Sequence, residues 1–168
     1  MIPWFERKFH FDYPAEMLPN ICARLRGTPA RLVEALESAP AQILTLRPND
    51  AWSAQEHAGH LADMEPLWLA RSEDFMQGRT QMTPADLQNR RTSEANHNLR
   101  APGELVREFR AERQKLLMLT KGLDMTMAVK ILPHPRMQTP MRLIDHLWFV
   151  AEHDDHHLAI IHERLQRG

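Results

Sequence analysis

The strongest constraint on the fold is the way prolines, glycines and capping residues divide the chain into amphipathic segments of helical length. Ser53 and Glu56 have the spacing of a capping box, in which the serine oxygen accepts the Glu56 N–H and the carboxylate accepts the Ser53 N–H. This signal predicts a long helix from Ser53 to about Gln77. Residues 101–103 open another helix, whose apolar residues recur at helical spacing until Gly122 ends it.

The N-terminal part of the chain carries a weaker helical pattern. Residues 20–26 are a short helical stretch that Gly27 is expected to end. Thr28 then offers an N-cap and Pro29 a first helical position for a helix that continues to about Ser38. We therefore expect one interrupted helix here, preceded by an irregular arm over the first dozen residues.

The C-terminal part supplies the fourth helical segment. The pair 139–140 (Thr-Pro) predicts the cap of a helix that continues to about Gln166. Residues 78–100 are polar and indicate a loop with a short helical turn, and residues 129–132 indicate a brief extended segment. Four amphipathic segments without a strong strand pattern predict an all-α protein, an antiparallel four-helix bundle.

Composition limits the protein classes that fit. The 168 residues are 43% apolar and 26% charged, which indicates one globular domain over residues 1–168 with a sizeable core. Lys and Arg (21) nearly balance Asp and Glu (22), so nucleic acid is a poor candidate partner. The sequence contains no run of about 20 apolar residues, so it predicts no membrane-spanning helix. Cys22 is the only cysteine, which excludes an intrachain disulfide and a Cys-based zinc site and favours the cytoplasm.

The chain has ten histidines, and half of them lie in the last predicted helix. Because imidazole is the commonest protein metal ligand, this helix is the first candidate for a metal site. At about 100° per residue, His146, His153 and His157 fall on one stripe flanked by apolar residues. His156 falls beside the carboxylates and is expected to face solvent. His153 and His157 are four residues apart and can share one ion, although chance alone supplies roughly 0.6 such pairs in this chain.

The helix that begins after Ser53 adds an inward-facing histidine. His60 lies among apolar residues, and it could be a metal ligand or a core imidazole satisfied by a neighbouring carboxylate. His57 lies only about 60° away, so periodicity does not choose between the two histidines. Asp63 and Glu56 border the same arc and could orient His60 through its other ring nitrogen, while Glu56 also has its capping role.

Two motifs together resemble the DinB/YfiT-like superfamily. Residues 52–63, WSAQEHAGHLAD, are similar to its W-S-x-x-E-H-x-x-H-L motif, and residues 153–161, HDDHHLAII, to its H-x-x-x-H-x-x-x-I motif. The resemblance implies a four-helix bundle in which His60, His153 and His157 hold one divalent ion. It implies zinc or nickel first, with iron, manganese and cobalt as alternatives.

The resemblance also implies an activity. It points to a metal-dependent hydrolase with an activated water, or to a transferase that uses a low-molecular-weight thiol such as bacillithiol or mycothiol, acting on a small-molecule substrate. Because Cys22 is expected on a buried helix, such a thiol would come from a bound cofactor. The candidates for acid–base or orienting roles are His57, His146, Asp63 and Glu56.

The sequence is also compatible with two other roles, and it predicts an assembly state. The histidines could form a non-catalytic site that only joins two helices. A DNA-interacting role has only the family name in its favour, and the balanced charge argues against it. The resemblance, together with the apolar arm residues Trp4, Phe5 and Phe9, predicts a homodimer.

Overall fold

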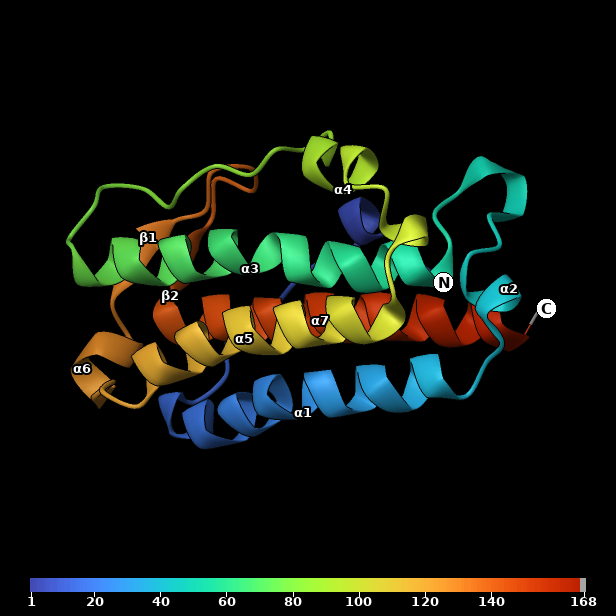
Figure 1. Cartoon of the computed structure of the whole chain (residues 1–168). Coiled ribbons are helices and arrows are strands. Elements are labelled where there is room, and N and C mark those ends of the chain that lie inside the picture. The colour runs from blue at the N-terminus through green and yellow to red at the C-terminus, as the bar shows by residue number, and fades with distance from the viewer. Residues whose placement is uncertain (167–168) are drawn as a thin grey trace.

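The computed structural model describes residues 1–166, and four long helices dominate it (Figure 1). The long helices are α1 (Leu18–Glu37), α3 (Ala54–Met76), α5 (Pro102–Thr120) and α7 (Leu143–Gln166). The short elements are α2 (Ala41–Leu44), α4 (Arg90–Glu94), α6 (Met125–Ala128), β1 (Ile131–Pro133), β2 (Pro140–Arg142) and the 3-10 turns η1 (Trp4–Glu6), η2 (Ala15–Met17), η3 (Pro48–Asp50) and η4 (His97–Leu99). The expected all-α four-helix bundle is confirmed.

The order of the helices around the bundle differs from a simple antiparallel arrangement. Helix α3 packs against α5 and α7, and α1 packs against the same two helices. Helices α1 and α7 run in one direction and α3 and α5 in the other (Figure 1), so the bundle has two parallel neighbouring pairs. The physical reason is the connection over residues 77–101, which returns along the length of α3 and lets α5 start at the same end.

Helix α1 is continuous, so the expected interruption near Gly27 is wrong. Pro29 has no N–H to donate to the carbonyl oxygen of Leu25, one turn earlier. The guanidinium of Arg113 on α5 donates to that oxygen instead, with Nη1 at 3.0 Å from it. A tertiary hydrogen bond thus satisfies the carbonyl that proline leaves free.

The start of α3 is as expected, whereas the start of α7 is not. The capping box forms, with Ser53 Oγ accepting from the Glu56 N–H at 3.1 Å and a Glu56 oxygen accepting from the Ser53 N–H at 2.8 Å. Pro140, expected to open the last helix, lies in β2 and pairs with Pro133 of β1. The extended stretch thereby gained an antiparallel partner strand, and α7 begins at Leu143.

A buried ionic network joins all four long helices. Arg113, from α5, donates two hydrogen bonds to Glu65 of α3, at 2.6 and 2.8 Å, and two to Asp154 of α7, at 2.6 and 3.0 Å. From α1, Thr28 donates to the same Asp154 carboxylate at 2.8 Å, and Leu25 supplies the carbonyl described above. The three charged side chains are at most 1% exposed. Burial raises the pKa of Glu65, and the charge of Arg113 opposes that rise.

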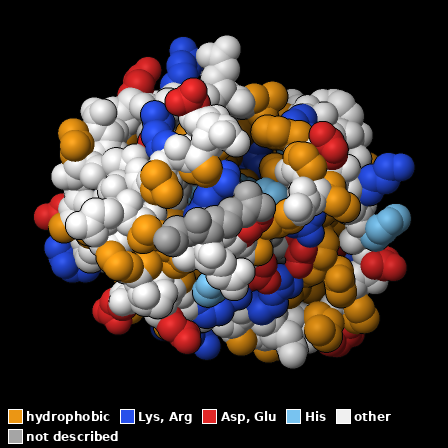
Figure 2. Space-filling model, turned by 90° about the vertical axis from the view of Figure 1, so that its right-hand side faces the viewer, with side chains coloured by type: hydrophobic (Ala, Val, Ile, Leu, Met, Phe, Trp, Pro, Cys, Tyr) orange, Lys and Arg blue, Asp and Glu red, His pale blue; other side chains and the backbone are white. Residues whose placement is uncertain are grey.

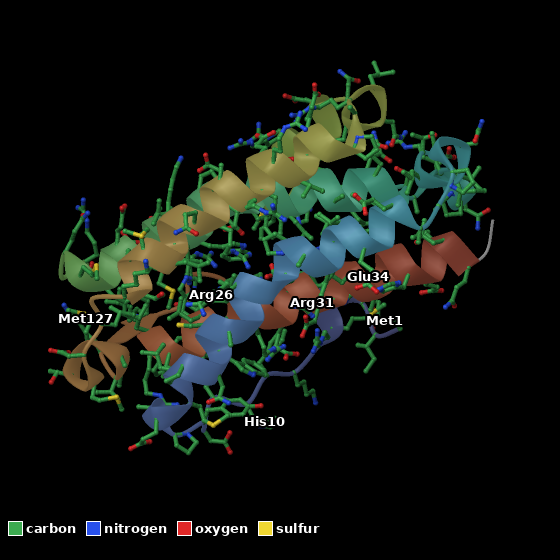
Figure 3. The ribbon with its side chains drawn as sticks, turned by 60° about the horizontal axis from the view of Figure 1, so that its bottom comes forward. Met1, His10, Arg26, Arg31, Glu34 and Met127 are labelled. Atoms are coloured by element: carbon green, nitrogen blue, oxygen red, sulfur yellow. The ribbon has the colours of Figure 1, made fainter. Side chains whose placement is uncertain are left out.

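The N-terminal arm covers the face of α7 that the helical wheel assigned to solvent. The Trp4 ring lies 5.4 Å from the ring of His156, and Arg7 pairs with Glu152 at 2.7 Å. His156 is therefore buried, at 8% exposure, and its expected exposure is wrong. Figure 3 shows the arm passing alongside α1 and α7, with His10 at its periphery.

The apolar residues of the arm have different surroundings. Trp4 and Phe9 contact each other and Phe149 of the same chain, with ring centroids 5.0 Å apart in all three pairs. Phe5 is 57% exposed. The homodimer thus stays a prediction, with Phe5 as the arm residue available to a second copy.

The surface carries interspersed charges. On the end of the bundle shown in Figure 2, acidic and basic side chains alternate with hydrophobic ones, in keeping with the near balance of charge in the sequence. Of the helices within residues 1–166, none has the length and apolar character that a membrane crossing requires.

Removing the central arginine tests the ionic network. Arg113→Met should lower the free energy of unfolding by about 3–5 kcal/mol, because Glu65 and Asp154 are left buried without a counter-charge. Urea denaturation of the metal-free protein measures the change. Lys115→Met, at an exposed pair on the same helix, should change it by less than about 1 kcal/mol. A similar small effect of both substitutions would contradict the role given to Arg113.

Candidate metal centre

Three histidines from two helices converge in the bundle. His60 comes from α3, and His153 and His157 come from successive turns of α7. One ring nitrogen from each lies within 4.8 Å of the others, and all three residues are buried. The Nε2 atoms of His60 and His153 are 3.4 Å apart. The structure thus brings together the three residues expected as ligands.

The spacing of these nitrogens fits a divalent ion. Tetrahedral zinc with Zn–N bonds of about 2.0–2.1 Å places its ligand nitrogens roughly 3.4 Å apart. The separation between His60 and His153 has this value, and the third nitrogen lies within a range that small side-chain rotations can close. Three imidazole nitrogens suit zinc, nickel, copper or iron better than magnesium or calcium, which prefer oxygen.

Burial keeps these imidazoles neutral, which is the form that binds metal. It lowers the pKa of His60 to about 4, with a smaller opposing effect from Asp63. It lowers the pKa of His153 and of His157 well below the usual 6.5, and the neighbouring histidines add to the effect. At neutral pH each ring therefore has one nitrogen lone pair available for a cation.

A hydrogen-bond chain fixes the orientation of His60. Its Nδ1 lies 3.0 Å from the hydroxyl of Thr92, and that hydroxyl donates to Asp63 at 2.9 Å. Since the hydroxyl proton is directed to the carboxylate, His60 Nδ1–H is the donor to Thr92, and Nε2 keeps its lone pair. Asp63 is thus connected to His60 through an intervening threonine, and its expected orienting role stays a prediction.

A further histidine, His97, hydrogen-bonds the Asp63 carboxylate. His97 Nε2 lies 2.8 Å from Asp63, and Arg91 donates to the other carboxylate oxygen at 3.1 Å. The His97 ring packs so closely on α3 that a Cβ at Gly59 would overlap it. Glycine within the His-Ala-Gly-His sequence thus makes room for the ring that anchors Asp63.

His57 partners the third histidine of the cluster. The Nδ1 atoms of His57 and His157 are 2.8 Å apart, so one ring donates to the other. If His157 donates, its Nε2 is left for the ion and the proton of His57 is on Nε2. Burial lowers the pKa of His57 to about 3. His57 is thus a neighbour of the cluster, and the structure groups His60, and not His57, with the α7 pair.

The remaining candidates lie elsewhere. Glu56 is bound by Arg47, at 2.7 and 2.9 Å, and by its capping partner, so it does not reach His60. His146 lies nearer the start of α7, with Nε2 at 3.3 Å from the carbonyl oxygen of Trp68, and it does not line the cavity at the cluster. The wheel grouped His146 with His153 and His157, but along the helix it lies about two turns from His153 and about three turns from His157.

The histidine cluster opens into a cavity of about 330 Å³. Its walls are largely aromatic or apolar, and its polar lining includes histidines and two arginines. The lining includes Trp52, His57, Met64, Trp68, Arg71, Asp86, His134, Arg136 and Phe149. A cavity of this size, with a few convergent polar groups, is typical of a small-molecule site.

Comparison with known proteins identifies the family and the fold of the chain. A sequence model described as the DinB superfamily matches residues 24–161, most of the chain. The chain belongs to the DinB superfamily. Among curated proteins, no sequence matches this DinB-superfamily chain.

A solved structure shares the fold of this DinB-superfamily chain. YfiT from Bacillus subtilis, described as a probable metal-dependent hydrolase with an unusual four-helix bundle topology, matches with a TM-score of 0.82. The match covers 96% of this chain and 93% of that one, at 21% sequence identity. At that identity the similarity shows a common fold.

Several residues beside the histidine cluster or on the cavity wall were not among the candidates predicted from the sequence. Thr92, His97 and His134 lie outside the long helices, so helical periodicity says nothing about them. Arg71 follows His60 by eleven residues and falls about 20° from it on a helical wheel. That position was a usable signal that Arg71 shares the face of α3 that bears His60.

Substitution of single histidines tests the ligand set. Replacing His60, His153 or His157 with alanine should sharply reduce bound zinc or nickel, because two imidazoles remain to hold the ion. Mass spectrometric metal analysis after dialysis gives the occupancy. His156→Ala, and His162→Ala at an exposed position of α7, should stay near wild type. Loss of metal in the His156 variant with retention in the His153 variant would show that the ligand set is wrong.

The hydroxyl of Thr92 provides a separate test of the hydrogen-bond chain. Thr92→Val removes the acceptor for His60 Nδ1–H while keeping the side-chain volume, and should weaken metal affinity roughly 10–100-fold. Thr92→Ser keeps the hydroxyl and should stay close to wild type. Competition with a chromophoric chelator measures both affinities. Equal affinity in the valine and serine variants would exclude an orienting role.

Proposed function

We propose that this chain is a metal-dependent enzyme that acts on a small molecule in the cavity beside His60, His153 and His157. The supporting observation is that three nitrogen donors, and no fourth, form the cluster within residues 1–166, at the wall of a cavity. Structural zinc sites are almost always closed by four protein ligands, whereas catalytic sites have three and leave a position for water or substrate. We propose zinc or nickel as the ion.

Such an ion could activate either a water molecule or a thiol. A divalent ion held by three neutral imidazoles lowers the pKa of a bound water towards about 7, or binds a thiol as its thiolate. The protein's own contribution is orientation and exclusion of water. Thr92 and His57 fix the rings of His60 and His157, and the Trp52 ring covers His60 at 4.9 Å.

Hydrolysis is the first candidate reaction. YfiT, with the same fold, is described as a probable metal-dependent hydrolase. In this reaction His57 serves as a hydrogen-bond donor to a substrate oxygen: when His157 Nδ1–H donates to His57 Nδ1, the proton of His57 is on Nε2. The low pKa of His57, about 3, makes it a poor base but leaves its neutral N–H available as a hydrogen-bond donor.

Thiol transfer is the second candidate, and the shortage of a general base favours it. The only carboxylate that lines the cavity, within the residues that the structure describes, is Asp86, and Asp86 pairs with Arg90. A metal-bound thiolate needs no such base for its attack on an electrophile. Cys22, the chain's only cysteine, does not line the cavity, so the thiol would be a low-molecular-weight cofactor.

Activity with and without metal tests this proposal. We expect the zinc- or nickel-loaded protein to hydrolyse members of a panel of small esters and amides, or to conjugate a small thiol to an electrophile such as monochlorobimane. Chelation should abolish turnover, restoring the ion should recover it, and His153→Ala should lack it. Strong stabilisation by metal without turnover in either screen would instead support a site that only joins α3 and α7.

A further inference from the structure

The cavity contains a buried cation that no carboxylate pairs with. Arg71 of α3 is 2% exposed, and it forms no ion pair with any carboxylate in residues 1–166. Its Nε donates to the carbonyl oxygen of Thr83 at 2.8 Å, and its Nη1 lies 3.1 Å from Nε2 of His134. Burial lowers the pKa of Arg71 to about 10, which still leaves it charged at neutral pH.

The acidic group whose charge acts on Arg71 is hydrogen-bonded to Thr83. Asp74 influences Arg71 through its charge, but its Oδ2 accepts two hydrogen bonds from Thr83, at 2.6 and 2.8 Å. A buried charge without a paired partner is costly, and buried arginines are normally matched by carboxylates, as Arg113 is here. The position of Arg71 on the cavity wall therefore points to a counter-ion that arrives with a ligand.

Neighbouring groups make this end of the cavity positive. Arg136 also lines it, half-buried, with its guanidinium 5.0 Å from the ring centroid of Phe5. His134, close to Arg71, is neutral, because burial and the two arginines lower its pKa to about 4. Asp86 is the opposing charge on the lining, and Arg90 already pairs with it.

The positive end and the histidine cluster lie at two ends of one space. Arg71 follows His60 by eleven residues on α3, about three turns and about 16 Å between Cα atoms. Met64 and Trp68 of the same helix line the cavity in between, and Phe149 of α7 faces them. The walls between the two polar ends are therefore apolar and aromatic.

We propose that Arg71, assisted by Arg136, is a binding site for the oxyanion group of the substrate, a carboxylate or a phosphate. The substrate class is an anionic small molecule whose apolar body lies against Trp68 and Phe149 and whose reacting group reaches the histidine cluster. Arginine matches both oxyanions in geometry, because its planar guanidinium can form two parallel hydrogen bonds to them. This inference rests on the proposed function for the identity of the ligand as a substrate, whereas anion binding itself can be measured without turnover.

Binding to the metal-free protein separates this site from the metal centre. The probes are 4-phenylbutyrate, its uncharged amide 4-phenylbutanamide, and 3-phenylpropylphosphonate, each titrated calorimetrically into protein treated with EDTA. We expect at least one of the two anions to bind about 10–100-fold more tightly than the amide, as a charge-assisted hydrogen bond requires. Whichever anion binds more tightly identifies the headgroup as carboxylate-like or phosphate-like.

Variants then assign the effect to the arginines. Arg71→Gln should remove the preference for the anion over the amide, and Arg136→Gln should reduce it. Arg79→Gln, at an exposed arginine near the end of the same helix and outside the cavity lining, should leave it unchanged. Thermal unfolding confirms that each variant is folded, and if Arg71→Gln does not fold, Arg136→Gln and the weakening of anion binding by added salt decide the question.

Two results would overturn the proposal. One is equal affinity of wild-type protein for anions and amide. The other is anion binding that appears only after zinc is added and is unchanged in Arg71→Gln, because the anion would then bind the metal. A failure of the proposed enzymatic function alone would give another result. The metal-free protein would still bind the anion, while the metal-loaded protein would show no turnover.

Discussion

The two buried ion pairs that Arg113 forms with Glu65 and Asp154 constrain how α3, α5 and α7 are placed relative to one another. Helix α1 joins them through the Leu25 carbonyl and Thr28. Each charge is buried, so none can be satisfied by water, and the three side chains must meet at one point. Asp154 directly follows His153 on α7, and Glu65 lies little more than one turn after His60 on α3. The network that fixes the register of these helices therefore also fixes the separation of the two histidines that face each other across them.

The same arginine explains why local sequence signals failed in α1. Gly27 and Pro29 are reliable helix breakers when the free carbonyl has no other donor, and on sequence alone they indicated an interruption. Arg113 donates to the Leu25 carbonyl from a helix more than 80 residues later in the chain. A tertiary contact of that kind has no local signature, so propensity and capping rules do not detect it.

Other parts of the site differ in how far the sequence could specify them. The spacing of His153 and His157, with the two family motifs, was enough to identify the cluster that the structure brings together. His156 was misplaced because a wheel represents one helix and omits the arm that covers it. Arg113 and Asp154 each fall within an otherwise apolar helical stripe, and a charge in such a stripe was a detectable sign of a buried ion pair. Residues in the 77–101 connection have no periodicity from which to argue.

The position of α7 in the chain has a consequence for how the protein matures. His57 and His157, whose rings touch, are 100 residues apart, and two of the three histidines of the cluster lie on this last long helix. A nascent chain emerges from its N-terminus and folds progressively. The first three long helices can be complete in synthesis while only one of the three histidines is present, so the proposed metal site is complete only after α7 has been made. A chain without α7 would lack two of the three proposed ligands, His153 and His157.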